Sequence, residues 1–193
     1  MKAWTYTDSV YDFIEIQDER FKLNTAYDNI FRLMKYLGKS NNLETFLDIM
    51  FFEKDHKRLT VLTEDWHKED YISLVEFITR EYISDCVESN NQKKCDILKD
   101  SELIFASFYF DYNISLIEKK GKMTWKEFLI LFSNLSENSP LGKAITLCST
   151  PDKELTTEGR KLKRQRNKML NGDIDINKQL NNLTKFLKAT AKR

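Results

Sequence analysis

The chain has 193 residues, of which 41% are hydrophobic and 32% are charged, and its formal net charge at pH 7 is +1. This length and apolar content are sufficient for one domain with a buried core. The sequence has no run of about 20 apolar residues, as a membrane-spanning helix requires, and residues 1–5 lack the layout of a signal peptide. We therefore expect a cytoplasmic protein without a membrane partner.

Glycine and proline are scarce, with five and two residues respectively. Strand-rich folds use these residues in many tight turns, so their scarcity favours an all-α fold. The cysteines Cys86, Cys95 and Cys148 are odd in number and follow no metal-ligand spacing. We interpret them as reduced thiols, with a Cys86–Cys95 disulfide as the alternative.

Charge divides the chain into two parts. Residues 1–150 carry 19 Lys and Arg against 25 Asp and Glu, a net charge of −6, whereas residues 151–193 carry 12 against 5, a net charge of +7. A basic tail on an acidic body suggests a separate task or a separate partner for the tail. We predict a compact multi-helix body at residues 1–151 and a basic, partly mobile helical tail at residues 152–193.

The first half of the body predicts helices after an ambiguous start. Residues 6–21 alternate loosely and are compatible with an irregular lead-in or a short helix. Apolar residues at helical spacing then predict helices at residues 24–37, with Asn24 as the N-cap, at residues 43–52, and at residues 63–88.

The next two helices have clear start signals. The first opens at Asp100 or Ser101 and ends near Asn113, and it is apolar around almost its whole circumference, so we expect it to be deeply buried. Its apolar residues are Leu103, Ile104, Phe108, Phe110 and Tyr112. Thr124 and Glu127 have the spacing of a capping box and predict the start of the second helix.

The end of the chain predicts three further helices. Pro140 fits the first turn of a short helix at residues 141–147. A Lys- and Arg-rich helix follows at residues 157–170 and is ended by residues 171–173. In the last segment, one helical face carries Ile176, Leu180, Leu183 and Leu187.

Residue types that support catalysis are few and scattered. His56 and His67 stand among charged residues, and the sequence has no phosphate-binding glycine loop, nucleophile elbow or dinucleotide fingerprint. The carboxylates around Trp66 are those expected in the first turn of a helix from its dipole. We therefore predict a protein that is not an enzyme and that holds no cofactor or metal.

The basic helix is the first candidate binding site, with Arg160, Lys161, Lys163, Arg164, Arg166 and Lys168. It is either a solvated face or a docking site for an acidic protein surface or nucleic acid. No aromatic residue lies within the run to stack on bases, and the acidic body would repel nucleic acid, so no nucleic-acid partner is expected.

The terminal apolar face is the second candidate site. Ile176, Leu180, Leu183 and Leu187 either fold back on the body or pack into a groove of a partner or of a second copy. Burying each side chain contributes about 1.5–3 kcal/mol. Ordering the segment costs much of that gain, so both interpretations remain open.

Residues 100–151 contain two motifs, I-x-A-S-F-x-x-x-Y-x-I-x-L and W-x-x-F-x-x-L-x-x-L. The first is formed by Ile104, Ala106, Ser107, Phe108, Tyr112, Ile114 and Leu116, and the second by Trp125, Phe128, Leu131 and Leu135. A short helix with Leu141, Lys143 and Ile145 follows. This arrangement resembles the tail-assembly chaperone family of siphophages and prophages of low-GC Gram-positive bacteria.

The resemblance implies a function in the host cytoplasm. Such chaperones are encoded beside the tape-measure protein, coat it, keep it soluble and recruit tail-tube subunits, and they are absent from the finished virion. In many phages such a chaperone is also made as a fusion to a shorter upstream chaperone. The shorter chaperone, or a second copy of this chain, is therefore a further expected partner. Two alternatives remain, namely a small nucleic-acid-binding regulator that uses residues 160–168, and a structural tail or head-completion protein.

Overall fold

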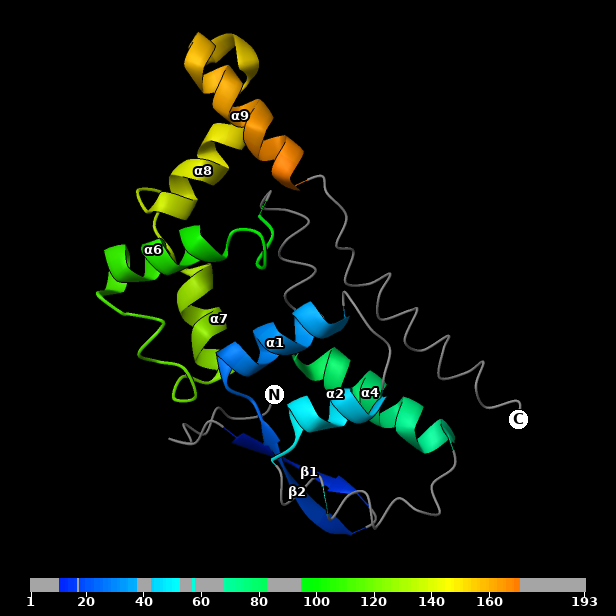
Figure 1. Cartoon of the computed structure of the whole chain (residues 1–193). Coiled ribbons are helices and arrows are strands. Elements are labelled where there is room, and N and C mark those ends of the chain that lie inside the picture. The colour runs from blue at the N-terminus through cyan, green and yellow to red at the C-terminus, as the bar shows by residue number, and fades with distance from the viewer. Residues whose placement is uncertain are drawn as a thin grey trace.

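The computed structural model describes residues 11–16, 18–37, 43–52, 57, 68–82 and 95–170 (Figure 1). The elements in chain order are β1 (Tyr11–Ile16), β2 (Glu19–Asn24), α1 (Tyr27–Leu37), α2 (Leu43–Met50), α4 (Lys68–Tyr82), α6 (Ser101–Tyr112), α7 (Trp125–Ser133), α8 (Pro140–Ser149), the 3-10 helix η1 (Asp152–Glu154) and α9 (Thr157–Leu170). Helices predominate, as predicted. The expectation of a purely all-α fold is nevertheless wrong, because β1 and β2 form a two-stranded antiparallel sheet.

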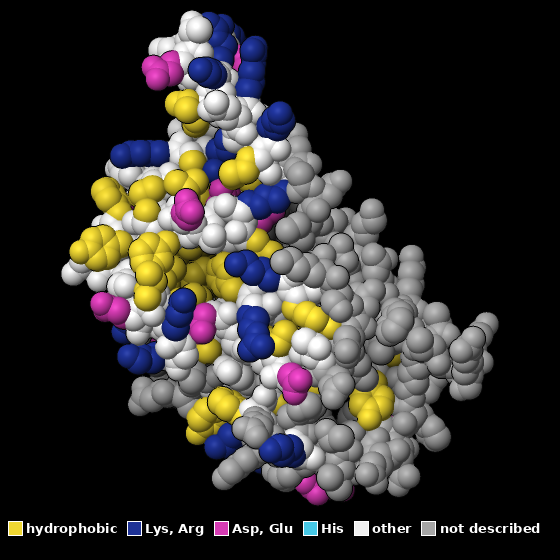
Figure 2. All heavy atoms as spheres, in the orientation of Figure 1, with side chains coloured by type: hydrophobic (Ala, Val, Ile, Leu, Met, Phe, Trp, Pro, Cys, Tyr) yellow, Lys and Arg dark blue, Asp and Glu magenta, His cyan; other side chains and the backbone are white. Residues whose placement is uncertain are grey.

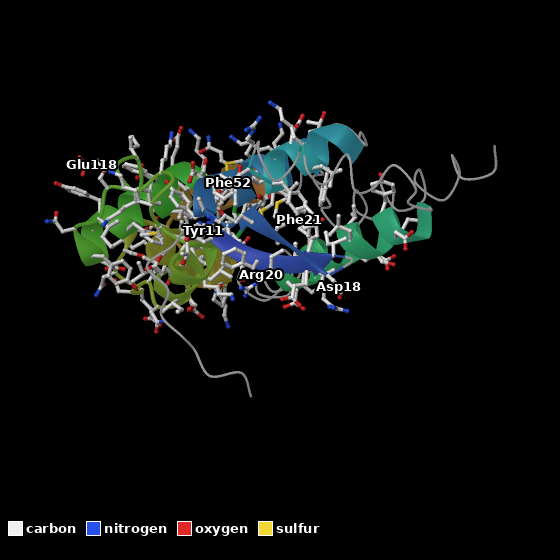
Figure 3. The ribbon with its side chains drawn as sticks, turned by 90° about the horizontal axis from the view of Figure 1, so that it is seen from below. Tyr11, Asp18, Arg20, Phe21, Phe52 and Glu118 are labelled. Carbon is white, nitrogen blue, oxygen red and sulfur yellow. The ribbon has the colours of Figure 1, made fainter. Side chains whose placement is uncertain are left out.

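The hairpin occupies the segment that the sequence left ambiguous. Phe21 and Leu23 of β2 are fully buried, and the two lie on one face because side chains alternate along a strand. Asp18 forms the turn with a φ of 63°, a left-handed conformation that aspartate tolerates. Figure 3 shows Asp18 at the tip of the hairpin and Tyr11 at its other end, where the Tyr11 and Phe52 ring centroids are 6.3 Å apart.

The core joins α1 to α7 through a stack of aromatic rings. The ring of Phe128 lies parallel to those of Phe108, Trp125 and Tyr27, at centroid distances of 5.1, 5.2 and 5.4 Å. The backbone connects the same helices, because Trp125 N donates to Thr25 O at 2.7 Å and Tyr27 N donates to Met123 O at 3.1 Å. Several apolar positions of the two motifs therefore form the core of the fold.

The expectation that the helix at residues 101–112 is deeply buried is only partly correct. Ile104 and Phe108 of α6 are buried, but Tyr109 and Phe110 are each 59% exposed. The reason is that α7 and α8 pack against one side of α6. Tyr109 and Phe110 therefore face the surface, whereas Leu103, Phe105 and Tyr112 are partly buried against the core.

The predicted helix ends are confirmed at several positions. Thr124 Oγ1 accepts from Glu127 N at 3.1 Å, and Glu127 Oε2 accepts from Thr124 N at 2.7 Å, which completes the predicted capping box. Asn113 ends α6 in a left-handed conformation, and α9 has the predicted bounds. Asn24, predicted as an N-cap, is instead the last residue of β2.

Several predictions fall outside the described residues. They concern His56, Trp66, His67, Cys86 and the terminal apolar face of Ile176, Leu180, Leu183 and Leu187. Cys95 and Cys148 are described, and both are buried cysteines that form no disulfide.

Candidate interaction surfaces

Helix α9 is fixed to the body by a buried ion pair. Arg166 Nη1 and Nη2 donate to Asp100 Oδ1 and Oδ2 at 2.7 and 3.0 Å, and the two residues are 9% and 1% exposed. Burial disfavours the charged form of Arg166, but the hydrogen bond and charge of Asp100 outweigh this effect and raise its pKa. Burial, with the nearby Asp100 carboxylate, raises the pKa of the Cys95 thiol well above its usual range.

Two lysine contacts attach the same helix, one at its middle and one at its C-terminal end. Lys163 Nζ donates to Thr150 O at 2.7 Å and to Asp152 Oδ1 at 2.8 Å. The hydrogen bond from Lys163 and its positive charge lower the pKa of Asp152. At the C-terminal end of the helix, Lys99 Nζ donates to Leu170 O at 2.8 Å. These contacts hold the first part of the predicted tail against the body.

The six predicted basic residues therefore separate into two groups. Lys163 and Arg166 face the body, whereas the exposed cations are Arg160, Lys161, Arg164 and Lys168. Leu162 and Met169 are also exposed, at 49% and 43%, and lie seven residues apart on one side of the helix. We call these four cations and two apolar residues the α9 outer face. The sequence prediction missed its apolar pair, although the seven-residue spacing was a usable signal.

A groove of about 670 Å³ lies between α1, α6 and the loop that follows α6. Its apolar lining consists of Tyr27, Phe31, Ile104, Phe105, Leu116 and Ile117, and its polar lining consists of Asp28, Arg32, Lys35, Ser101, Glu102 and Lys120. We call it the α1–α6 groove. Ile117 is 63% exposed at its edge. In Figure 2, hydrophobic side chains gather over α6, with Lys and Arg side chains beside them.

The wall of this groove is held by hydrogen bonds between the loop and α1. The Tyr27 hydroxyl donates to Leu116 O, and Gly121 N donates to Asp28 Oδ1 at 2.9 Å. Gly121 has a φ of 65°, which glycine adopts without strain. Burial raises the pKa of Tyr27 to about 12, and the Asp28 charge adds to the shift.

A second groove, of about 620 Å³, lies between the hairpin and α4. Its apolar lining is Phe13, Ile14, Ile16, Leu74 and Phe77, and its polar lining is Glu15, Arg20, Asp70 and Ser73. We call it the hairpin groove. Arg20 lies 4.7 Å from the ring centroid of Phe13 and forms an ion pair with Glu15 at 3.6 Å. Sequence reasoning found neither groove, because each is built from segments far apart in the chain.

Two features are absent from the described part of the chain. No group of three or more His, Cys, Asp and Glu side chains there has an arrangement able to hold a metal ion. Within the same residues, no helix is long and apolar enough to cross a membrane.

Comparison with known proteins identifies a family. A family model described as "Bacteriophage Gp15 protein" matches residues 6–171, which include the hairpin, both grooves and α9. Neither curated proteins nor solved structures show a significant match to the chain. Because the match spans most of the 193 residues, the chain belongs to the bacteriophage Gp15 protein family.

Proposed function

We propose that this protein is a phage tail-assembly chaperone that binds the tape-measure protein in the host cytoplasm and keeps it soluble. The observation that carries the proposal is the α1–α6 groove, whose apolar lining is open at the surface. In this proposal the protein helps to recruit tail-tube subunits, leaves before the virion is complete, and has no enzymatic activity.

The chemistry of the groove fits an amphipathic helix. Phe31 and Phe105 are partly buried in its lining, and Ile117 is exposed at its edge, so the groove offers apolar contact over a length of surface. A helix that lays its apolar face into such a groove is a common mode of peptide recognition. Arg32, Lys35 and Lys120 lie along the same groove and would contact polar or acidic residues beside the apolar stripe.

In this proposal the tape-measure protein is the client, and it needs such a groove to stay soluble. A long helix with an uncovered apolar stripe aggregates through that stripe. Covering it with a reversible apolar contact keeps the helix soluble until tube subunits replace the chaperone. The membership of a bacteriophage family supports a client of phage origin.

Co-expression tests the proposal. The tape-measure protein of the same phage or prophage is expressed with and without this chain, and soluble yield and co-purification are measured. Rescue of soluble yield together with co-purification is expected. If the tape-measure protein remains insoluble and unbound, also after addition of the shorter upstream chaperone, the proposal fails. Detection of the chain in purified virions would instead favour a structural tail protein.

A further inference from the structure

The α9 outer face and the hairpin groove have complementary chemistry. The first presents Leu162 and Met169, with Lys161 and Lys168 about 100° around the helix from them and Arg160 and Arg164 beyond these two lysines. The second has an apolar lining, includes the carboxylates of Glu15 and Asp70, and lies beside the exposed acidic residues of the hairpin turn, Asp18 and Glu19. Arg20 is the one cation that lines the described part of this groove, and it is paired with Glu15.

The two surfaces lie at opposite ends of the molecule. Figure 1 shows α8 and α9 extending away from the body at one end and the β1–β2 hairpin at the other. Figure 3, which views the molecule from the hairpin end, shows Arg20 and Asp18 on that side. Helix α9 is held in place by Arg166 and Lys163, so it cannot reach the hairpin groove of its own chain.

We propose that the chain associates with itself head to tail, with the α9 outer face of one copy seated in the hairpin groove of the next. In this contact Leu162 and Met169 enter the apolar groove, and Lys161 and Lys168, which flank them, meet the carboxylates around it. The charges of the whole chain act in the same direction, because residues 1–150 carry a net −6 and residues 151–193 a net +7. Opposite charges on two approaching surfaces speed and orient their encounter.

The contact has a definite symmetry consequence. Each copy uses a different surface on its two sides, so the association is heterologous and leads to a ring or an open chain. Such an assembly would place one α1–α6 groove per copy along an extended client. The self-association itself does not depend on the proposed function, because it requires the purified chain alone.

Sedimentation velocity on the full chain tests the proposal at low and high salt, from about 0.05 to about 0.5 M NaCl. Species larger than the monomer are expected at low salt and the monomer at high salt. The α9 variant Lys161→Glu/Lys168→Glu and the groove variant Glu15→Lys/Asp70→Lys should each weaken association on the order of tenfold or more. The control Lys119→Glu/Lys122→Glu makes the same charge change as the α9 variant at exposed loop positions and should associate like the wild type.

Mixing the variants gives the sharpest outcome. The α9 variant keeps an intact groove and the groove variant keeps an intact α9, so an equimolar mixture should regain association. Because the two reversed surfaces are also opposite in charge, a dimer and larger species are both expected. Phe13→Ser, at a residue 42% exposed in the groove, provides a second groove variant if the charge reversals disturb folding as judged by circular dichroism. The proposal is overturned if the mixture forms no dimer or larger species. It is also overturned if the control Lys119→Glu/Lys122→Glu loses as much association as the α9 variant.

Two further results would also overturn it. One is a wild-type chain that remains monomeric at low salt at about 0.1 mM, because a useful contact has a dissociation constant below that value. The other is a large species that disappears after nuclease treatment, which would assign the basic face of α9 to nucleic acid.

Discussion

At the residue scale, the attachment of α9 depends on Arg166 and Asp100. Their two parallel hydrogen bonds are buried, and a buried charge is costly unless a partner of opposite charge is present. Asp100 also accepts from Asp96 N at 2.9 Å, so the same carboxylate orders the turn before α6. Loss of Arg166 therefore affects both elements.

Replacing Arg166 with Met should lower the free energy of unfolding by about 3–5 kcal/mol, because the Asp100 carboxylate remains buried without its cation. Urea unfolding followed by circular dichroism measures the effect. The control Arg164→Met, at an exposed position of the same helix, should change stability by no more than about 0.5 kcal/mol. Equal losses in the two variants would show that the pair does not hold α9.

Tyr27 gives the protein a predictable response to alkaline pH. Its pKa rises from 10.0 in the unfolded chain to about 12 in the fold. Between these values the unfolded chain has released the phenolic proton and the folded chain has kept it. The contribution of Tyr27 to stability is therefore complete below pH 10 and is lost as the pH rises towards about 12.

The variant Tyr27→Phe should accordingly show a shallower fall of melting temperature between pH 10 and about 12 than the wild type. At pH 7 it should be less stable by about 0.5–1.5 kcal/mol, because the hydrogen bond to Leu116 is absent. Melting curves recorded from pH 7 to pH 11.5 give both quantities. The control Tyr109→Phe alters an exposed tyrosine and should follow the wild-type profile; a Tyr27→Phe profile parallel to wild type would contradict the argument.

At the scale of elements, local signals predicted most helices well. The capping box at Thr124 and the basic run of α9 both gave correct ends, because the information lies within a few residues of each end. The hairpin was missed for a specific reason. Val10, Phe13 and Ile16 also recur every three residues, so periodicity did not separate a strand from a helix.

Tertiary contacts decided the features that local signals did not predict. Tyr109 and Phe110 are exposed because α7 and α8 pack against the other side of α6. Arg166 is buried because it pairs with Asp100, 66 residues away in the chain. Both grooves similarly combine distant segments. The candidate basic helix was predictable from the sequence, but the division of its cations between an inner and an outer side was not.

The start of α8 offers a test of close packing between elements. A Cβ at Gly142 would lie 2.3 Å from Ser136 O and 2.7 Å from Glu137 Cα, so the backbone before α8 would have to move. Gly142→Ala should therefore cost about 1–3 kcal/mol in thermal or urea unfolding. In the matched variant Gly159→Ala, the nearest atom is the Thr156 side-chain oxygen at 3.3 Å, and the loss should be much smaller. Equal losses would show that the backbone before α8 yields readily.

At the scale of the whole molecule, three surfaces are available for separate contacts. The α1–α6 groove lies beside α6, the hairpin groove lies beside α4, and the α9 outer face lies on the extension formed by α8 and α9 (Figure 1). In the proposed function, the chain would bind a client and a second copy at once, because the proposed sites share none of the residues that line them.

The most direct test of the central claim compares two substitutions during co-expression with the tape-measure protein. Ile117→Glu places a charge at the edge of the α1–α6 groove, and Ile130→Glu makes the same change on α7 at a residue that is 47% exposed. We predict that Ile117→Glu loses most of the soluble, co-purifying tape-measure protein and that Ile130→Glu retains it. Equal retention by both variants would contradict a client site in the α1–α6 groove.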